Sequence, residues 1–120
     1  MSEVPVLDAA VVSGLRQLTP AGEPDVLAEV LNLFLVEVPL RMDRLRNAWA
    51  AGNIEEVLRA VHSLKGGAGN IGARRLYEVC RQLDAKGKSG DLAGAAPLVD
   101  ALGLEFGKVE AEIRRLLSNS

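Results

Sequence analysis

The chain contains a single histidine, and its surroundings could support phosphoryl transfer. His62 is followed three residues later by Lys65. An unperturbed imidazole has a pKa of about 6.5, so near neutral pH much of it is uncharged and carries a free nucleophilic nitrogen. Such a nitrogen can accept a phosphoryl group. On a helix, Lys65 would lie on the adjacent face, where its ammonium could contact phosphate oxygens.

The residues after His62 include three glycines, Gly66, Gly67 and Gly69. Each costs about 1 kcal/mol relative to alanine inside a helix, so one interpretation is that the helix ends after Lys65 and the glycines form a loop. However, the helical spacing of apolar residues continues through them, at Leu64, Ala68 and Ile71. We therefore expect the helix to continue, with side chains absent beside His62 so that a large partner can reach its ring.

Two nearby features suggest other chemistry and are less specific. Residues 67–72 match G-x-G-x-x-G, but a dinucleotide site needs a strand before this motif, and an amphipathic helix precedes it here. Cys80 lies in register with apolar neighbours and is predicted to be a small core residue. A lone cysteine excludes an internal disulfide and, with one histidine, a zinc cluster of the His/Cys type. No carboxylate cluster near His62 could hold magnesium, so we expect no metal or cofactor in this chain.

Periodic apolar residues predict five helices around this segment and no strand. Asp8 can cap a short helix over 9–18, and 19–22 reads as a loop. A long apolar stripe follows, with Pro24 at its first helical position and Asp25 in its first turn. Pro39 should kink or restart that helix, which stops near Gly52.

The second half of the chain has clear cap residues. Asn53 is a good N-cap for the helix that carries His62, and Gly72 should break it. The next helix is expected over 73–86, before Gly87 and Gly90. Asp91 can cap the last one, which either begins or bends at Pro97. The prediction is an all-α antiparallel four-helix bundle with a short additional N-terminal helix.

Composition is that of an ordinary globular domain, with 48% apolar and 25% charged residues and a net charge of -2. No apolar run approaches the roughly 20 residues that span a bilayer, and no signal peptide is visible, so we expect a cytoplasmic protein. Residues 59–88, however, hold seven basic residues and only two acidic ones, Glu78 and Asp84. This basic middle is either a solvated helix face or a docking surface for an acidic partner.

The segment from His62 to Gly72 resembles the motif of the histidine-containing phosphotransfer (HPt) family: histidine, any residue, a hydrophobic residue, lysine and glycine, then small residues, an aliphatic residue and a glycine. It matches without a gap, and the resemblance covers about residues 24–117 of a single domain, 1–120. Asp84 is a departure, because family members often have glutamate there.

The resemblance implies a phosphorelay intermediate rather than an enzyme with its own ATP site. His62 would accept a phosphoryl group from a receiver-domain aspartyl phosphate and pass it to another receiver. Lys65 would steady the phosphate and Gly66 would leave clearance for docking, while Arg59 and Gly69 are further binding candidates. Receiver active sites are acidic and would supply Mg²⁺.

Two alternatives remain open. One is a non-catalytic helical adaptor that binds receiver domains. The other is a dimerisation and phosphoacceptor fragment of a sensor kinase, although such motifs usually have a proline where Gly66 and Gly67 stand. We expect a monomer that binds neither nucleic acid nor membrane, because no large apolar stripe is left over.

Overall fold

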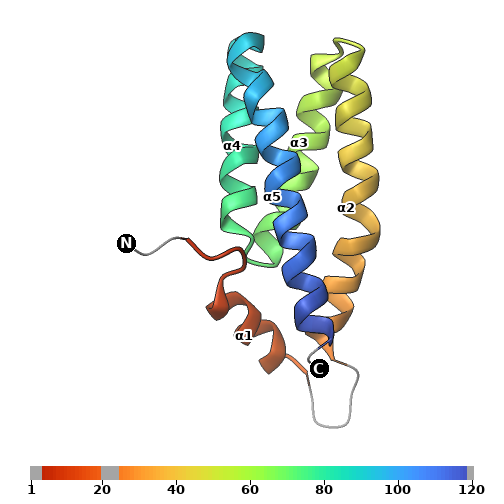
Figure 1. Cartoon of the computed structure of the whole chain (residues 1–120), viewed down its shortest axis with the longest axis vertical. Coiled ribbons are helices and arrows are strands. Elements are labelled where there is room, and N and C mark those ends of the chain that lie inside the picture. Colours follow the sequence, from red (N-terminus) through yellow and green to blue (C-terminus); the bar gives the residue numbers. More distant parts are fainter. Residues whose placement is uncertain (1–3, 20–24, 119–120) are drawn as a thin grey trace.

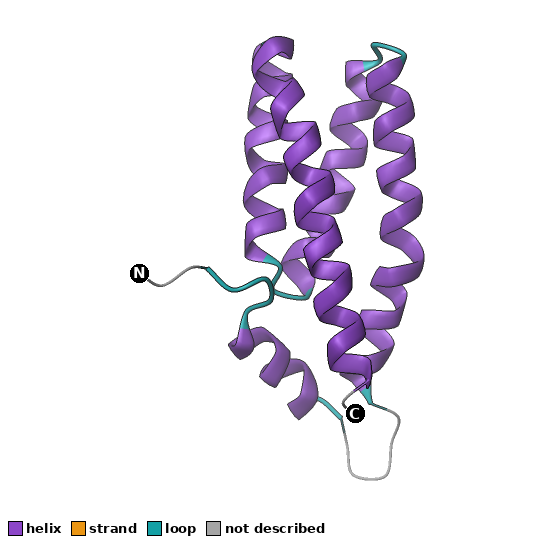
Figure 2. Ribbon diagram, viewed as in Figure 1, coloured by secondary structure: helices purple, strands orange, loops and turns teal. Residues whose placement is uncertain are grey.

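The computed structural model describes residues 4–19 and 25–118, and the regular structure in these ranges is entirely helical (Figure 2). The helices are α1 (Ala9–Gln17), α2 (Val26–Ala50), α3 (Ile54–Asn70), α4 (Arg74–Ser89) and α5 (Leu92–Ser118). The four long helices alternate in direction and form an up-down-up-down bundle in which α3 packs between α2 and α4 (Figure 1). The predicted fold class is confirmed.

Short polar side chains cap the N-termini of four helices, and the caps at Asp8, Asn53 and Asp91 were predicted, whereas α4 begins after Ala73 without a side-chain cap. The N-cap oxygens of Asp8, Asp25, Asn53 and Asp91 accept hydrogen bonds from the backbone amides of Ala10, Leu27, Glu56 and Gly94. Glycines with φ of 71°, 73° and 78° follow α2, α3 and α4, namely Gly52, Gly72 and Gly90. This left-handed backbone strongly favours glycine, so these residues fix where the three turns of the bundle lie.

The core fills the space between the four long helices. Its largest fully buried side chains include Leu31, Leu45, Leu64, Leu83, Leu102 and Ile113. Cys80 is also fully buried, as predicted, and Phe34 packs against Phe106 with ring centroids 6.3 Å apart. Trp49 is only half-buried at the edge of the core. Burial of these apolar faces is the main term that stabilises the bundle.

The predicted end of α4 at residue 86 was wrong, and at the two prolines the structure excludes one of the two expected outcomes. Pro39 lies inside α2 and does not restart it, and Pro97 lies inside α5, which begins before it at Leu92. In α2, apolar residues before and after the proline, Val38 and Met42, are both buried, so packing holds the helix together across the missing backbone donor. Helix α4 continues through Gly87 to Ser89.

Two smaller expectations concern the start of α2. Asp25 is its N-cap rather than a first-turn residue. Pro24 and most of the predicted loop at 19–22 lie outside the described residues.

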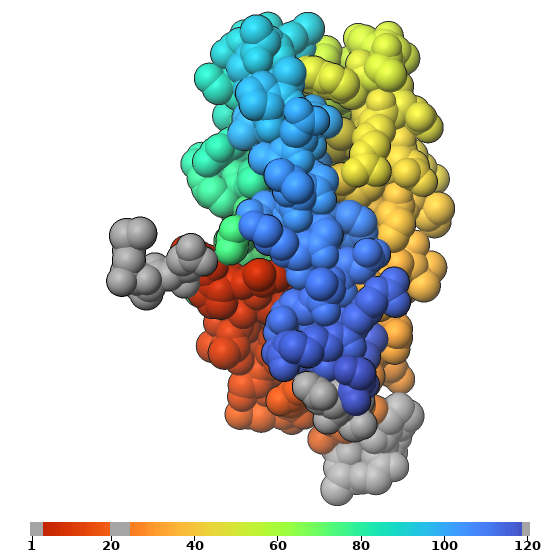
Figure 3. Space-filling model, viewed as in Figure 1, coloured from red at the N-terminus to blue at the C-terminus, as the bar shows by residue number. Residues whose placement is uncertain are grey.

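The N-terminal segment closes one end of the bundle, beside the α3–α4 turn (Figure 3). The Asp8 amide donates to the Gly72 carbonyl at 2.8 Å, and the Asp8 carboxylate pairs with Arg74 at 2.6 Å. Leu7 and Val12 are buried there. The turn of the α3–α4 hairpin, which carries the His62 segment, is therefore covered by the N-terminal segment.

Candidate functional site

His62 lies on the solvent side of α3. The helix buries Val61, Leu64 and Ala68, each at most 1% exposed, and this fixes its rotation so that the His62 side chain is exposed. In the described part of the chain the ring has no hydrogen bond or ion pair. The ring is thus free to meet a partner from outside.

The glycines after His62 lie within α3, which continues to Asn70, so the loop interpretation is wrong. A Cβ placed on Gly66 would have no atom within 4 Å, which means that the space beside His62 is open. A Cβ on Gly67 would make only ordinary contacts at 3.8–3.9 Å, and one on Gly69 would lie 3.7 Å from the Tyr77 ring. Packing therefore does not require glycine at any of the three positions.

The same observation excludes the dinucleotide interpretation of residues 67–72. They form the end of α3 and its terminal turn, and no strand precedes them among the described residues.

Lys65 is half-buried on the flank of α3 that faces α4. Its ammonium is close enough to Cys80 to act on that thiol. Burial raises the pKa of Cys80 to about 12, and the positive charge of Lys65 opposes this rise. Within the described ranges, the Lys65 ammonium forms no ion pair, so it is available to an incoming anion.

The remaining basic residues of the 59–88 segment are all neutralised locally. All six pair with carboxylates, at nitrogen–oxygen distances of 2.5–3.4 Å: Arg59, Arg74, Arg75, Arg81, Lys86 and Lys88. Most of these pairs are exposed and contribute little stability, but opposite charges held together cancel each other's field. The excess of basic residues in the sequence is therefore not a continuous bare cationic surface, and Lys65 is its one unpaired member in the described chain.

Two residues that the sequence analysis did not place at the site lie with His62 on its α4 flank. A hollow of about 380 Å³ there is lined by Glu55, Leu58, Arg59, His62, Asp84 and Lys88. Lys88 pairs with Asp84 at 2.9 Å. Arg59, a predicted binding residue, shares this hollow but is paired with Glu55 and Glu56. The helical spacing of Asp84 and Lys88 shows that they share a face, but it does not show that this face meets α3.

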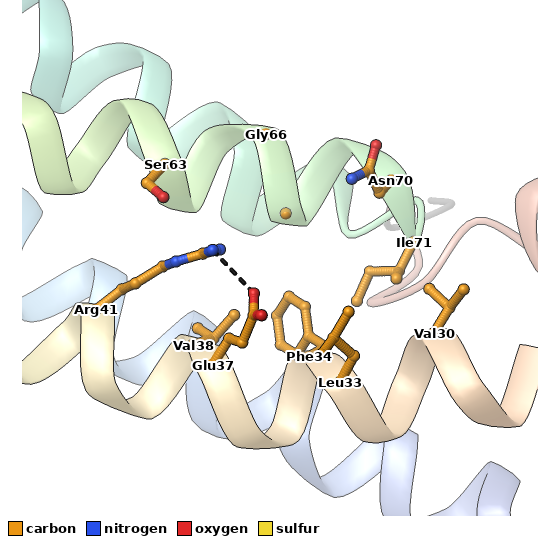
Figure 4. A pocket seen from close by; sticks show the side chains of 11 residues that line it. Val30, Leu33, Phe34, Glu37, Val38, Arg41, Ser63, Gly66, Asn70 and Ile71 are labelled. Carbon is orange, nitrogen blue, oxygen red and sulfur yellow. Dashed lines mark hydrogen bonds and ion pairs between the residues drawn. The ribbon is translucent and has the colours of Figure 1, made fainter.

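The exposed face of α3 that carries His62 and Gly66, called the His62 ridge below, lies between α2 and α4. Its α2 flank is lined by different side chains from its α4 flank. A groove of about 310 Å³ between α2 and α3 has apolar walls that include Val30, Phe34 and Ile71. Glu37 and Arg41 lie at its mouth and form an ion pair at 2.9 Å (Figure 4). Gly66 lines the groove, so the open space beside His62 continues into it.

An exposed apolar stripe on α2 was also missed. Leu33, Val36 and Leu40 are 56%, 65% and 59% exposed, at helical spacing. This is a correction to the expectation that no apolar stripe is left over. Leu33 lines the α2–α3 groove, so the stripe continues into the site.

Neither a metal site nor a membrane span is found among the described residues. They contain no group of three or more His, Cys, Asp or Glu side chains placed to bind a metal ion. None of their helices combines the length and the apolar character needed to span a bilayer.

Comparison with known proteins gives a consistent result. A sequence model described as the Hpt domain matches residues 29–119. Histidine-containing phosphotransfer protein 2 of Arabidopsis thaliana is 23% identical over 107 residues, which are 87% of this chain and 69% of that protein. Protein 5 of the same name and plant is 35% identical over 75 residues, covering 57% of this chain and 45% of that protein.

Solved structures agree with these matches. Histidine-containing phosphotransfer protein B of Pseudomonas aeruginosa superposes with a TM-score of 0.88 at 26% identity, covering 98% of this chain and 99% of that one. The HPT domain of a Shewanella sensor hybrid histidine kinase has the same fold, with a TM-score of 0.79 at 18% identity and 96% coverage of both chains. With an exposed histidine in the family motif and this bundle around it, the chain belongs to the Hpt domain family, whose members are histidine phosphorelay intermediates of two-component signalling.

Proposed function

We propose that His62 is the phosphoryl-accepting residue of this domain, taking the group from the aspartyl phosphate of one receiver domain and passing it to the aspartate of another. One observation carries the assignment to this residue. The His62 ring is exposed and without a partner in the described chain, next to a glycine whose missing side chain leaves open space.

The transfer balances without a further reactant. An unprotonated ring nitrogen of His62 attacks the phosphorus of the receiver's aspartyl phosphate. A P–N bond forms while the P–O bond to the aspartate breaks, and the electron pair of that bond stays on the released carboxylate. A carboxylate of the second receiver then attacks the same phosphorus and returns the nitrogen to its original state.

The neighbouring residues have distinct roles in this proposal. Lys65 contacts the phosphoryl oxygens, because its ammonium has no ion-pair partner among the described residues. Gly66 gives the receiver access. Arg59 and Gly69 are secondary binding candidates, and Arg59 would have to leave its glutamates to take part. The receiver supplies Mg²⁺, and this chain acts as a monomeric cytoplasmic phosphocarrier that holds no cofactor and has no ATP site.

The direct test is transfer from receiver domains that have been phosphorylated with a small donor. Incubated with these and Mg²⁺, the wild-type chain should gain acid-labile phosphate, and His62→Gln should gain none. Ser13→Ala, at an exposed position of α1 that lines neither surface beside His62, is the matched control and should be labelled normally. Labelling that survives in His62→Gln would overturn the proposal, as would labelling by ATP alone, which would instead indicate kinase activity.

A further inference from the structure

The two flanks of the His62 ridge offer different surfaces to a docking partner. On the α4 flank, two acids and two bases line the hollow, and both bases are held in ion pairs. On the α2 flank, a groove with apolar walls is also lined by Ser63, Asn70 and one ion pair, between Glu37 and Arg41. A partner that reaches over Gly66 enters this groove directly, because Gly66 forms part of its lining.

Arg41 extends from α2 to the surface of α3. Figure 4 shows the side chain reaching across toward α3. Its Nη1 atom would lie 3.8 Å from a Cβ placed on Gly67, so the guanidinium lies close to a residue that carries no side chain. Glu37, one turn earlier, accepts a hydrogen bond from Nη2 at 2.9 Å and holds the side chain in this direction. The Arg41 side chain is 31% exposed, so it is positioned but not covered.

The Arg41 guanidinium has hydrogen-bond donors that Glu37 does not use. A guanidinium has five N–H donors in a rigid fork, and the Glu37 carboxylate takes one of them. Arg41 lines the groove, with Nη1 toward Gly67, on the opposite flank of α3 from Lys65. A second carboxylate that approaches along the groove could therefore bind Arg41 without breaking its pair with Glu37.

We propose that Arg41, held by Glu37, is a residue that determines which receivers this domain accepts, by binding a carboxylate at the rim of the receiver's acidic active site while an aliphatic side chain of the receiver fills the groove. The inference rests on the proposed function, since it names how the same partner is chosen. Charges at the edge of an interface mainly set association rate and partner choice. A receiver with no acid at this point would leave Arg41 desolvated and unpaired, which disfavours it.

The experiment measures transfer from a panel of phosphorylated receivers at two or more ionic strengths. Arg41→Gln should raise the half-saturating concentration of the preferred receiver about tenfold, leave the maximal rate unchanged and flatten the salt dependence. Arg41→Lys should keep the salt dependence but reduce the preference among receivers, because an ammonium lacks the planar fork. Arg44→Gln is the matched control, an exposed arginine of α2 outside the groove, and should stay within twofold of wild type.

Two further measurements separate the possible failures. Labelling of His62 by phosphoramidate, a small donor that needs no docking, should be equal in all variants, and so should their melting temperatures. If Arg41→Gln behaves like Arg44→Gln while the wild-type chain still exchanges phosphate with receivers, this inference is overturned and the proposed function stands. If the wild-type chain is labelled by phosphoramidate but exchanges phosphate with no receiver, both are overturned.

Discussion

The two helices of the α3–α4 hairpin differ in whether their polar and charged side chains are paired within the fold. On the outer ridge of α3, His62 is exposed, Lys65 has no ion pair in the described structure, and Gly66 faces open space. After the turn, every basic residue of α4 is paired with a carboxylate, and Cys80 is fully buried. The charged groups of α4 are thus paired within the fold, whereas His62 and Lys65 on α3 have no such pair among the described residues.

Gly66 and Gly72 differ in the space that a side chain would find there. Gly72 has φ of 73°, and a Cβ there would lie 2.8 Å from the Cβ of Val11 and 2.9 Å from that of Asp8. The fold therefore requires glycine at 72. At Gly66 the fold makes no such demand, although a helix-interior glycine lowers stability, and this is what the proposed docking role would explain.

The largest expected effect is at the crowded glycine. Gly72→Ala should lower the free energy of unfolding by about 2–4 kcal/mol, because it adds left-handed strain of about 1–2 kcal/mol to overpacking against the N-terminal segment. Urea unfolding measures this. Gly52→Ala is the control: Gly52 has φ of 71° but open space around it, so it should show the strain alone. Equal losses in the two variants would show that Gly72 is not crowded.

The next effect is on transfer. Gly66→Leu should slow phosphoryl transfer from a receiver by about tenfold or more, because the new side chain fills the space that docking needs. Its free energy of unfolding should rise by up to about 1 kcal/mol, as helix propensity predicts. Gly107→Leu in α5, another glycine with open space, should gain similar stability and transfer normally. A full transfer rate in Gly66→Leu would refute the clearance argument.

A smaller effect separates the two kinds of lysine. Lys65→Ala should slow transfer or shorten the lifetime of the phosphohistidine several-fold, because it removes the unpaired cation nearest the site. Lys86→Ala removes an α4 lysine already paired with Asp91 at 3.3 Å and should change neither quantity. Phosphate release from purified phosphorylated protein gives the lifetimes. Equal behaviour of the two variants would contradict the distinction drawn between α3 and α4.

The smallest effect concerns a charge that serves α4 alone. Hydrogen bonds from Arg81 and Gln82 lower the pKa of Glu78 from 4.5 to about 2. The stabilisation is fully present above pH 4.5 and is lost as the pH falls towards 2. The stability difference between wild type and Glu78→Gln should therefore shrink across that window, measured by chemical denaturation, with transfer at neutral pH unaffected. A difference that does not vary with pH would contradict the shift.

The sequence predicts those features of the fold and the site that depend on a single helix. The exposure of His62, the cap at Asn53 and the break at Gly72 follow from local spacing and local backbone preference. Features that need the rotation of one helix against another were missed, such as the approach of Asp84 and Lys88 to His62 and of Arg41 to Gly67. The pairs of Arg74 with Asp8 and of Arg75 with Glu105 were missed for the same reason. The pairs within α4 follow from helical spacing, and net charge along the sequence did not take them into account.

Helix continuity at proline also depends on tertiary packing. A proline removes one backbone donor wherever it stands, and local rules favour a break. Buried residues on both sides of Pro39 hold α2 together instead.

The most direct test uses the fact that the chain has one histidine. With ¹⁵N-labelled histidine, the ring nitrogens of His62 give a single set of NMR signals, which can be followed as a phosphorylated receiver and Mg²⁺ are added. We predict that one ring nitrogen shifts and gains coupling to phosphorus, and that a second, unphosphorylated receiver reverses the change. Loss of phosphate from the receiver while the His62 ring signals stay unchanged would contradict the account.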